Sequence, residues 1–169
     1  MVYLPYLNLI RHHLAQHNIM AYWLFKTEPD TFSIDTLRVQ QRACWEGVRN
    51  YQARNMMRDQ VRLGDQVLIY HSSCKQVGVA GIAEVVREAY PDHFAFDPGS
   101  EVFDAKSTPE NPRWVMVDVA FVSKMERIIP LSVMKAMPEL AQMPLVKRGN
   151  RLSIMPVTEA EWLAILSLR

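Results

Sequence analysis

Residues 64–88, GDQVLIYHSSCKQVGVAGIAEVVRE, contain the pattern that decides the fold. An apolar run at 66–71 follows a Gly-Asp turn signal, and a longer run at 77–88 follows a polar connection. Short apolar runs bounded by turn residues predict two strands. Gly78 and Gly81 lie inside the second strand, where glycine favours bulges or bends. Bends of this kind let a small sheet curl, so we expect a curved sheet.

The rest of the chain mixes short strands with short helices. Further strands are predicted at residues 22–26, 113–125 and 152–157, and helices at 33–37, 51–62 and 131–137 and from 158 onward. Ser33 is a typical N-cap, and the Thr158 to Glu161 pattern is a capping box. The proline-rich residues 91–112 are expected to form a loop. Because strands and helices do not alternate regularly, the sequence favours an α+β fold, with a curled mixed sheet flanked by short helices.

Length and charge indicate one domain with separate charged surfaces. The chain has 169 residues, 49% of them apolar, and a formal net charge of +1, which gives no global attraction for polyanions. Charges are segregated along the sequence, with a local balance of +2 over residues 45–62, +3 over 140–158 and −5 over 84–110. Solvated faces are the usual explanation of such runs, but the two basic segments are also candidates for binding phosphates.

The cysteines and the N-terminus suggest an ordinary cytoplasmic protein. Cys44 and Cys74 lie 30 residues apart without zinc-ligand spacing, which favours free thiols in a reducing compartment and no metal or cofactor. Residues 1–20 are too short an apolar segment to cross a membrane and lack a signal-peptide pattern. We expect residues 1–20 to be a poorly ordered extension and residues 21–169 to be the domain.

Catalytic motifs are missing from the sequence. It contains no nucleophile elbow, phosphate-binding glycine loop, zinc-protease motif or dinucleotide fingerprint. His71 and Ser72 are adjacent on a predicted strand and therefore point to opposite faces, so they do not make a base and nucleophile pair. One enzymatic alternative stays open, in which Glu28 and His71 act as acid and base on a nucleotide or nucleoside.

Residues suited to recognition gather at three places. One predicted strand ends at Lys26, Thr27 and Glu28, another ends at Tyr70, His71 and Ser72, and residues 45–50 read Trp-Glu-Gly-Val-Arg-Asn. If these segments meet, they form one concave site with an aromatic wall, polar side chains and a cationic rim. A flat heterocycle fits such a site, because stacking a base on an aromatic ring is worth about 1–3 kcal/mol. The remaining alternative is a protein-interaction module in which residues 45–58 only pack.

Five segments in collinear order resemble the EVE domain family. They are WLFKTEPD at 23–30, WEGVRNYQARN at 45–55, GDQVLIYHSS at 64–73, PRW at 112–114 and RGNRLS at 148–153. The resemblance covers residues 22–166 and implies a PUA-like pseudo-barrel. The resemblance also implies a domain that binds DNA or RNA without catalysis and holds a modified base, cytosine in particular, in an aromatic-lined pocket. The resemblance does not indicate the oligomeric state.

The resemblance also implies which residues form the site. The base-binding set is Lys26, Thr27, Glu28, Trp45, Val48, Arg49, Asn50, Tyr70, His71, Ser72, Arg151, Leu152 and Ser153. From the two basic segments, and not from the resemblance, we expect Arg54, Arg58, Lys147 and Arg148 to contact phosphates. Two positions depart from the family pattern. Thr27 stands where serine is usual, and residues 101–104 replace a tyrosine-rich pattern.

Overall fold

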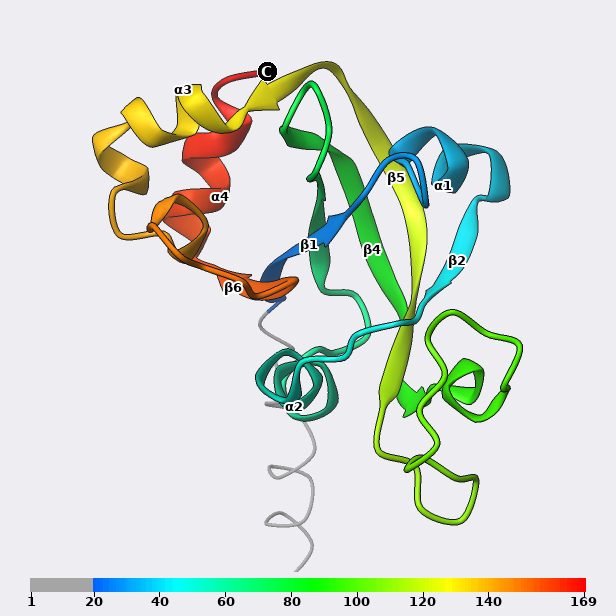
Figure 1. The fold of residues 1–169 in the computed structure, drawn as a ribbon. Helices are drawn as coiled ribbons and strands as arrows, with labels where there is room; N and C mark the ends of the chain where they lie inside the picture. The colour runs from blue at the N-terminus through cyan, green and yellow to red at the C-terminus, as the bar shows by residue number, and fades with distance from the viewer. Residues whose placement is uncertain (1–19) are drawn as a thin grey trace, which may run out of the picture.

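The computed structural model describes residues 20–169; the predicted extension at residues 1–20 lies, apart from Met20, outside the described residues (Figure 1). Six strands make up its sheet: β1 (Tyr22–Thr27), β2 (Arg42–Trp45), β3 (Gln66–His71), β4 (Gly78–Pro91), β5 (Val115–Pro130) and β6 (Ile154–Val157). The helices are α1 (Ile34–Gln40), α2 (Tyr51–Asp59), α3 (Leu131–Ala136) and α4 (Glu159–Leu166), with short 3₁₀ helices η1 (His93–Phe96), η2 (Pro138–Leu140) and η3 (Pro144–Val146).

The strands form one mixed sheet in the order β2-β5-β4-β3-β1-β6. Only β1 and β3 run parallel, and the other neighbours are antiparallel. Bulges interrupt the β4 pairings, including one between Val79 and Gly81, as the glycines predicted. The α+β class and the mixed sheet are therefore confirmed. Some details of the prediction were wrong: β2 was missed, β4 continues three residues past its predicted end at 88, and β5 continues five residues past its predicted end at 125.

The pairing does not close the sheet into a barrel. Strands β2 and β6 lie at its two edges, and no hydrogen-bonded pairing joins them within residues 20–169. Each of these edge strands has only four residues. Closure removes sheet edges by pairing them along their length, so the predicted pseudo-barrel is not seen as a closed structure.

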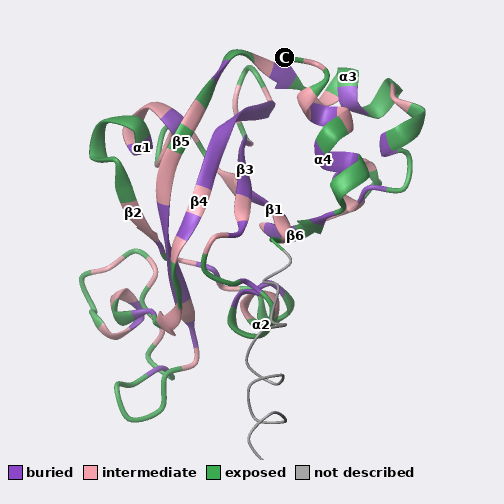
Figure 2. Ribbon diagram, turned by 180° about the vertical axis from the view of Figure 1, so that it is seen from behind, coloured by how far each residue is buried: buried purple, intermediate pink, exposed green. Residues whose placement is uncertain are grey.

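Two apolar layers cover the two faces of the sheet. Figure 2 marks the buried residues of the strands and helices in purple. On one face Trp23, Phe25, Trp45, Ile69 and Val117 pack with Ile34 and Leu37 of α1 and Met57 of α2. On the other, Leu24, Leu68, Tyr70 and Met155 pack with Met134 of α3, Leu140 of η2, Leu145 of η3 and Trp162 of α4. Because neighbouring strand residues point to opposite faces, every strand except β2 contributes buried residues to both layers, whereas β2 contributes Trp45 to the first layer alone.

Local hydrogen bonds fix the ends of the helices. Ser33 caps α1 as predicted, and Thr36 completes a capping box there; Thr158 forms the predicted capping box of α4. Helix α2 ends at Asp59, three residues before its predicted end at 62. Asp65 explains this difference, because its buried carboxylate accepts hydrogen bonds from the Arg62 N–H at 2.8 Å and the Trp23 indole at 2.9 Å. That carboxylate joins the turn after α2 to the start of β1.

Two further findings bear on the sequence predictions. Cys44 and Cys74 are free thiols, as expected. Within residues 20–169, none of the helices has the length and apolar character that crossing a bilayer requires.

Candidate functional site

A pocket of about 490 Å³ lies between the end of β1 and the outer edge of β2. Its walls are formed by Lys26, Thr27, Thr31, Phe32, Gln40, Arg42, Ala43, Cys44, Trp45 and Glu46. Three of the predicted base-binding residues, Lys26, Thr27 and Trp45, therefore do come together. The volume falls within the range of about 300–1,000 Å³ that is common for small-ligand sites.

Aromatic rings form the apolar wall of this pocket. The ring of Trp45 lies 5.3 Å from that of Phe25 and 5.9 Å from that of Phe32, the second pair meeting edge to face. Trp45 is only 7% exposed, so most of its ring belongs to the core and only a margin faces the pocket. Edge-to-face contacts of this kind hold aromatic rings in defined orientations. The wall is thus preformed.

The end of β1 is held in place by its neighbours. The Lys26 N–H donates to the Ser153 carbonyl at 2.8 Å, and the Ser72 N–H and hydroxyl both donate to the Thr27 carbonyl, at 2.9 and 3.3 Å. The Thr27 hydroxyl donates to the Phe32 carbonyl at 2.9 Å. Ser72 and Ser153, both predicted to bind the base, therefore support the pocket wall from outside the lining.

Burial shapes the chemistry of the pocket. Desolvation lowers the pKa of the half-buried Lys26, because burial disfavours the ammonium form. Desolvation, with the nearby Glu46 carboxylate, raises the pKa of the Cys44 thiol to about 11. Since the thiolate is the nucleophilic form, Cys44 is a poor nucleophile at neutral pH.

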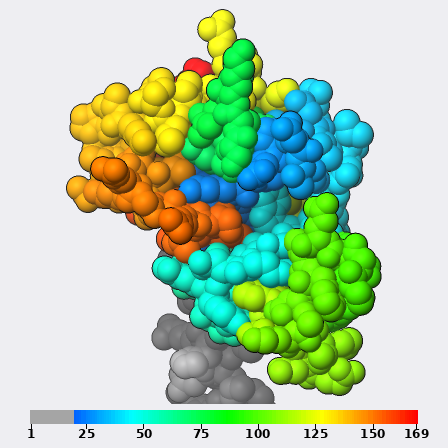
Figure 3. All heavy atoms as spheres, viewed as in Figure 1, coloured from blue at the N-terminus to red at the C-terminus, as the bar shows by residue number. Residues whose placement is uncertain are grey.

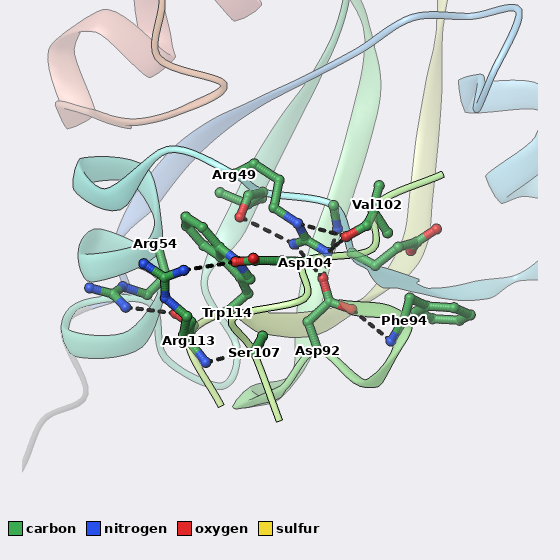
Figure 4. A network of polar contacts seen from close by, with 12 residues as sticks. Arg49, Arg54, Asp92, Phe94, Val102, Asp104, Ser107, Arg113 and Trp114 are labelled. Atoms are coloured by element: carbon green, nitrogen blue, oxygen red, sulfur yellow. Dashed lines mark hydrogen bonds and ion pairs between the residues drawn. The ribbon is translucent and has the colours of Figure 1, made fainter. Parts of the chain in front are cut away.

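Arg49 anchors the segment that follows Trp45 (Figure 4). Its guanidinium forms an ion pair with Asp92 at 2.8 Å, donates to the Val102 carbonyl at 2.9 Å and lies 5.4 Å from the centre of the Trp114 ring. The Asp92 side chain is fully buried and also accepts the Gly47 N–H at 3.0 Å. These bonds tie Arg49 into the protein interior.

The neighbours of Arg49 are also engaged in the fold. Val48 is buried in the core. The Asn50 side-chain oxygen accepts the Ala53 N–H at 3.0 Å and so caps α2. The side-chain oxygen of Asn50 thus holds the helix start, while its amide nitrogen points to no partner within residues 20–169.

Two of the predicted phosphate contacts form bonds within the protein. Arg54 donates to the Arg113 carbonyl at 2.6 Å and lies 4.9 Å from the Tyr51 ring (Figure 4). Arg58 forms an exposed ion pair with Asp59 at 2.7 Å. An exposed pair of this kind exchanges easily for other partners, because it is worth at most about 1 kcal/mol.

Tyr70 and His71 lie outside the pocket. Tyr70 points into the opposite core layer, where burial raises its pKa to about 12. His71 points to the Trp45 side of the sheet, but it lines a different hollow of about 1300 Å³ and accepts the Ile34 N–H at 3.1 Å through Nε2. Desolvation lowers the pKa of His71, which keeps the imidazole neutral and able to accept this bond.

The Glu28 and His71 pair has no direct contact in the described structure. Glu28 uses its backbone carbonyl to accept the Thr31 and Phe32 N–H groups at 3.0 and 2.8 Å, while its side chain is exposed. Within residues 20–169, no hydrogen bond or ion pair links Glu28 to His71.

A basic loop precedes β6 and continues to Ser153, whose carbonyl bonds to the end of β1. Arg148 and Arg151 are exposed, and Lys147 is exposed with one bond to Gln142 at 2.9 Å. Leu152 is half-buried and packs against both apolar layers. The orange segment that contains this loop lies on the same face of the molecule as blue β1 and turquoise α2 (Figure 3).

Comparison with known proteins identifies the family: the EVE domain matches residues 21–168. The chain belongs to the EVE domain family. Human thymocyte nuclear protein 1 is 43% identical to it over 170 residues, which cover 89% of this chain and 75% of the human protein.

Solved structures agree with this assignment. A Pseudomonas syringae protein superposes with a TM-score of 0.86 at 49% identity, covering 88% of this chain and 99% of that one. Human THYN1, crystallised in complex with 5-methylcytosine-containing DNA, superposes with a TM-score of 0.83 at 43% identity, covering 88% of this chain and 96% of the human chain.

Several pocket residues of this EVE domain were not predicted from its sequence. They are Thr31, Phe32, Gln40, Arg42, Ala43 and Cys44; Glu46 was part of the predicted 45–50 segment but not of the predicted base-binding set. Ala43 and Cys44 adjoin Trp45, so a strand prediction for that segment would have found them. Phe32 carries no such signal, because a turn held by the Glu28 carbonyl brings it to the pocket. Asn150 was also missed; it braces the basic loop by donating to the Pro144 carbonyl at 2.7 Å and accepting the Leu152 N–H at 2.9 Å.

Proposed function

We propose that this EVE domain binds nucleic acid and holds one flipped or unpaired base, a cytosine methylated at C5, in the pocket between β1 and β2. The observation that carries the proposal is that Trp45, Phe32, Lys26 and Thr27 meet around a single pocket. The complex of human THYN1 with 5-methylcytosine-containing DNA supports the choice of base. The same complex favours DNA over RNA as the polymer. The binding panel described below includes RNA oligonucleotides to test this choice.

The pocket residues suggest how a base would be held. The exposed margin of Trp45 and the edge of Phe32 offer apolar contact to a planar ring, and such contact is sequence-tolerant because every base has a π-face. The Lys26 ammonium is partly stripped of water and lies 5.8 Å from the centre of the Tyr70 ring, at the end of β1, so a polar group on a ligand that reached past the strand end would give it a partner. Both effects favour a polar, flat ligand over an apolar one.

Curvature of the sheet accounts for the position of the pocket. Three strands separate β1 from β2 in the sheet order, and neighbouring strands lie about 4.8 Å apart. In a flat sheet the rings of Phe25 and Trp45 would be separated by about four such spacings, yet their centres are 5.3 Å apart. We infer that the sheet curls towards a PUA-like shape, which brings the two strands together around the ligand.

The basic loop supplies the contacts to the polymer. Arg148 and Arg151 are exposed, and with Lys147 they give this loop three cations without an acid. Phosphate contacts release counterions, so the affinity should fall as salt rises. Arg58 would join this face by exchanging Asp59 for a phosphate.

We infer that binding occurs without catalysis. The imidazole of His71 caps the first turn of α1, and its lone pair is therefore unavailable as a base. The Cys44 thiol is protonated at neutral pH. The expectation of a cytoplasmic location stays a prediction, while the animal relatives are named nuclear proteins.

A binding panel tests the proposal. Fluorescence anisotropy would measure the affinity for DNA and RNA oligonucleotides, single-stranded and duplex, with cytosine or 5-methylcytosine, at about 50 and about 200 mM salt. We expect tightest binding to 5-methylcytosine DNA and weaker binding at the higher salt. Equal affinity for all bases, or no binding of any oligonucleotide, would contradict the proposal.

A variant pair places the site. Lys26→Met should lower the affinity for the 5-methylcytosine oligonucleotide about tenfold, because a hydrogen bond from a charged group is worth about 1.5–3 kcal/mol. Lys135→Met, at an exposed position on α3, is the matched control and should bind as the wild type does. Equal affinity of the two variants would remove Lys26 from the site.

A further inference from the structure

Strand β2 lies at an edge of the sheet, and its pairing with β5 determines where its peptide groups point. The register pairs Ala43 with Val119, Cys44 with Asp118 and Trp45 with Val117. One residue earlier, the Phe121 N–H donates to the Gln41 carbonyl at 2.9 Å. Residues directly opposite in an antiparallel pair alternate between bonded and non-bonded positions. Gln41, Ala43 and Trp45 therefore bond to β5.

The alternate residue, Cys44, directs its peptide N–H and C=O away from β5. No residue in the described part of the chain forms a hydrogen bond with either group. Cys44 is half-buried and lines the pocket, so these two groups face it from the outer edge of β2. A peptide group that loses water without gaining a partner costs free energy. The pocket thus presents one backbone donor and one backbone acceptor that have no protein partner within residues 20–169 and that a ligand can engage.

We propose that the peptide group pair of Cys44 reads the hydrogen-bonding edge of the base, on the basis of the proposed function. The Cys44 N–H donates to ring nitrogen N3 of cytosine, and the exocyclic N4 amino group donates to the Cys44 carbonyl. The base thereby takes the place that one residue of a neighbouring strand would occupy.

This pairing accounts for two kinds of selectivity. A methyl group at C5 lies off the edge formed by N3 and N4, so methylation leaves both hydrogen bonds intact. Thymine and uracil present the reverse pattern, a donor at N3 and an acceptor at position 4, which would set like groups against each other. A site with fixed polar groups rejects such a ligand strongly, because its own groups are left unpaired.

The shape of the pocket favours a single base over a peptide strand. β2 has only four residues, and Lys26, Thr27 and Phe32 stand across the pocket from its edge. Added strands need several consecutive residues to bond along an open edge. Here the turn after β1 limits that space to a pocket of about 490 Å³.

Proline substitution tests the donor. Proline is tolerated on an edge strand where its missing N–H would point outward, so Cys44→Pro removes no bond to β5. Cys44→Ala is the control for loss of the side chain. We expect both variants to keep the wild-type circular dichroism, and Cys44→Pro to bind 5-methylcytosine DNA at least about tenfold more weakly than Cys44→Ala. Equal affinities of the two variants would overturn the inference while leaving the proposed function in place.

Amide hydrogen exchange of the wild-type protein tests the same bond without depending on a variant that folds. In the free protein the Cys44 amide should exchange rapidly, whereas the Ala43 and Trp45 amides are protected by β5. Saturation with 5-methylcytosine DNA should slow exchange at Cys44 at least about tenfold, and an oligonucleotide with 3-deazacytosine, which lacks the N3 acceptor, should not. Unchanged exchange at Cys44 on DNA binding would overturn the inference. Protection of the Cys44 amide that grows with protein concentration in the absence of DNA would also overturn it, because it would indicate strand pairing between two copies of the protein.

Discussion

Asp92 is expected to be the polar residue whose loss most weakens the structure around the pocket. Its side chain is fully buried and accepts hydrogen bonds from the Gly47 N–H at 3.0 Å, the Phe94 N–H at 3.1 Å and the Arg49 guanidinium at 2.8 Å. Asp92→Asn keeps the shape but removes the charge and turns one acceptor into a donor. Because Oδ2 accepts from both Gly47 and Arg49 while Oδ1 accepts from Phe94, an amide nitrogen in either position leaves at least one of these donors without its acceptor.

The expected cost follows from the burial of the pair. Removing one partner of a buried ion pair costs about 3–5 kcal/mol. Arg49 keeps its bond to the Val102 carbonyl, and its side chain is 24% exposed, so water compensates part of the loss. We therefore expect Asp92→Asn to lower the free energy of unfolding by about 3 kcal/mol, the lower end of that range. This lies below the total stability of about 5–15 kcal/mol that is usual for a domain, so the variant should still fold.

Urea denaturation at pH 7, followed by tryptophan fluorescence, measures this loss. Asp59→Asn is the control, because Asp59 and Arg58 form an exposed pair, and it should change stability by less than about 0.5 kcal/mol. A double-mutant cycle of Asp92→Asn with Arg49→Met should give a coupling energy above about 1 kcal/mol. A loss below about 1 kcal/mol for Asp92→Asn would refute the view that this pair anchors the segment after Trp45.

Two further outcomes are expected. Because the pKa of His71 is lowered in the folded protein, the unfolded state takes up the proton first, so stability should fall as the pH drops through about 6.5 and level off below the folded-state pKa. Urea titrations should show this loss in the wild type relative to His71→Gln. A stability difference between the two proteins that stays constant with pH would disprove it. Gly81→Ala should lower the free energy of unfolding by about 2 kcal/mol or more, because an added Cβ would lie 2.5 Å from the Ile34 side chain and 2.6 Å from the Ser123 carbonyl. Gly99→Ala is the control, since its Cβ would meet only the exposed Asp97 side chain at 3.3 Å. Equal melting temperatures of the two variants would contradict this reasoning.

Local patterns in the sequence predicted much of the fold. The N-caps Ser33 and Thr158 were identified because their hydrogen bonds reach only three residues along the chain. The bulge near Gly81 was expected because a glycine within a strand marks such a position. The order of the motifs likewise indicated the EVE family.

The grouping of site residues needed the tertiary structure. The predicted site joined Trp45 and Tyr70, but Tyr70 points to the opposite side of the sheet from Trp45. Arg49 was expected to contact the ligand, but Asp92, 43 residues away in the sequence, holds it in the interior. Strand β2 has too few residues for its apolar pattern to stand out, and its existence depends on pairing with β5.

The sequence by itself therefore determined the α+β class, the helix starts, the glycine bends and the family, because these depend on hydrogen bonds and backbone preferences within a few residues. Only the tertiary structure decided that Lys26, Thr27 and Trp45 share a pocket with Phe32, and that the peptide group pair of Cys44 faces it. The physical reason is the sheet. Its order, register and curvature arise from contacts between distant segments, and they set which face and which edge each residue presents.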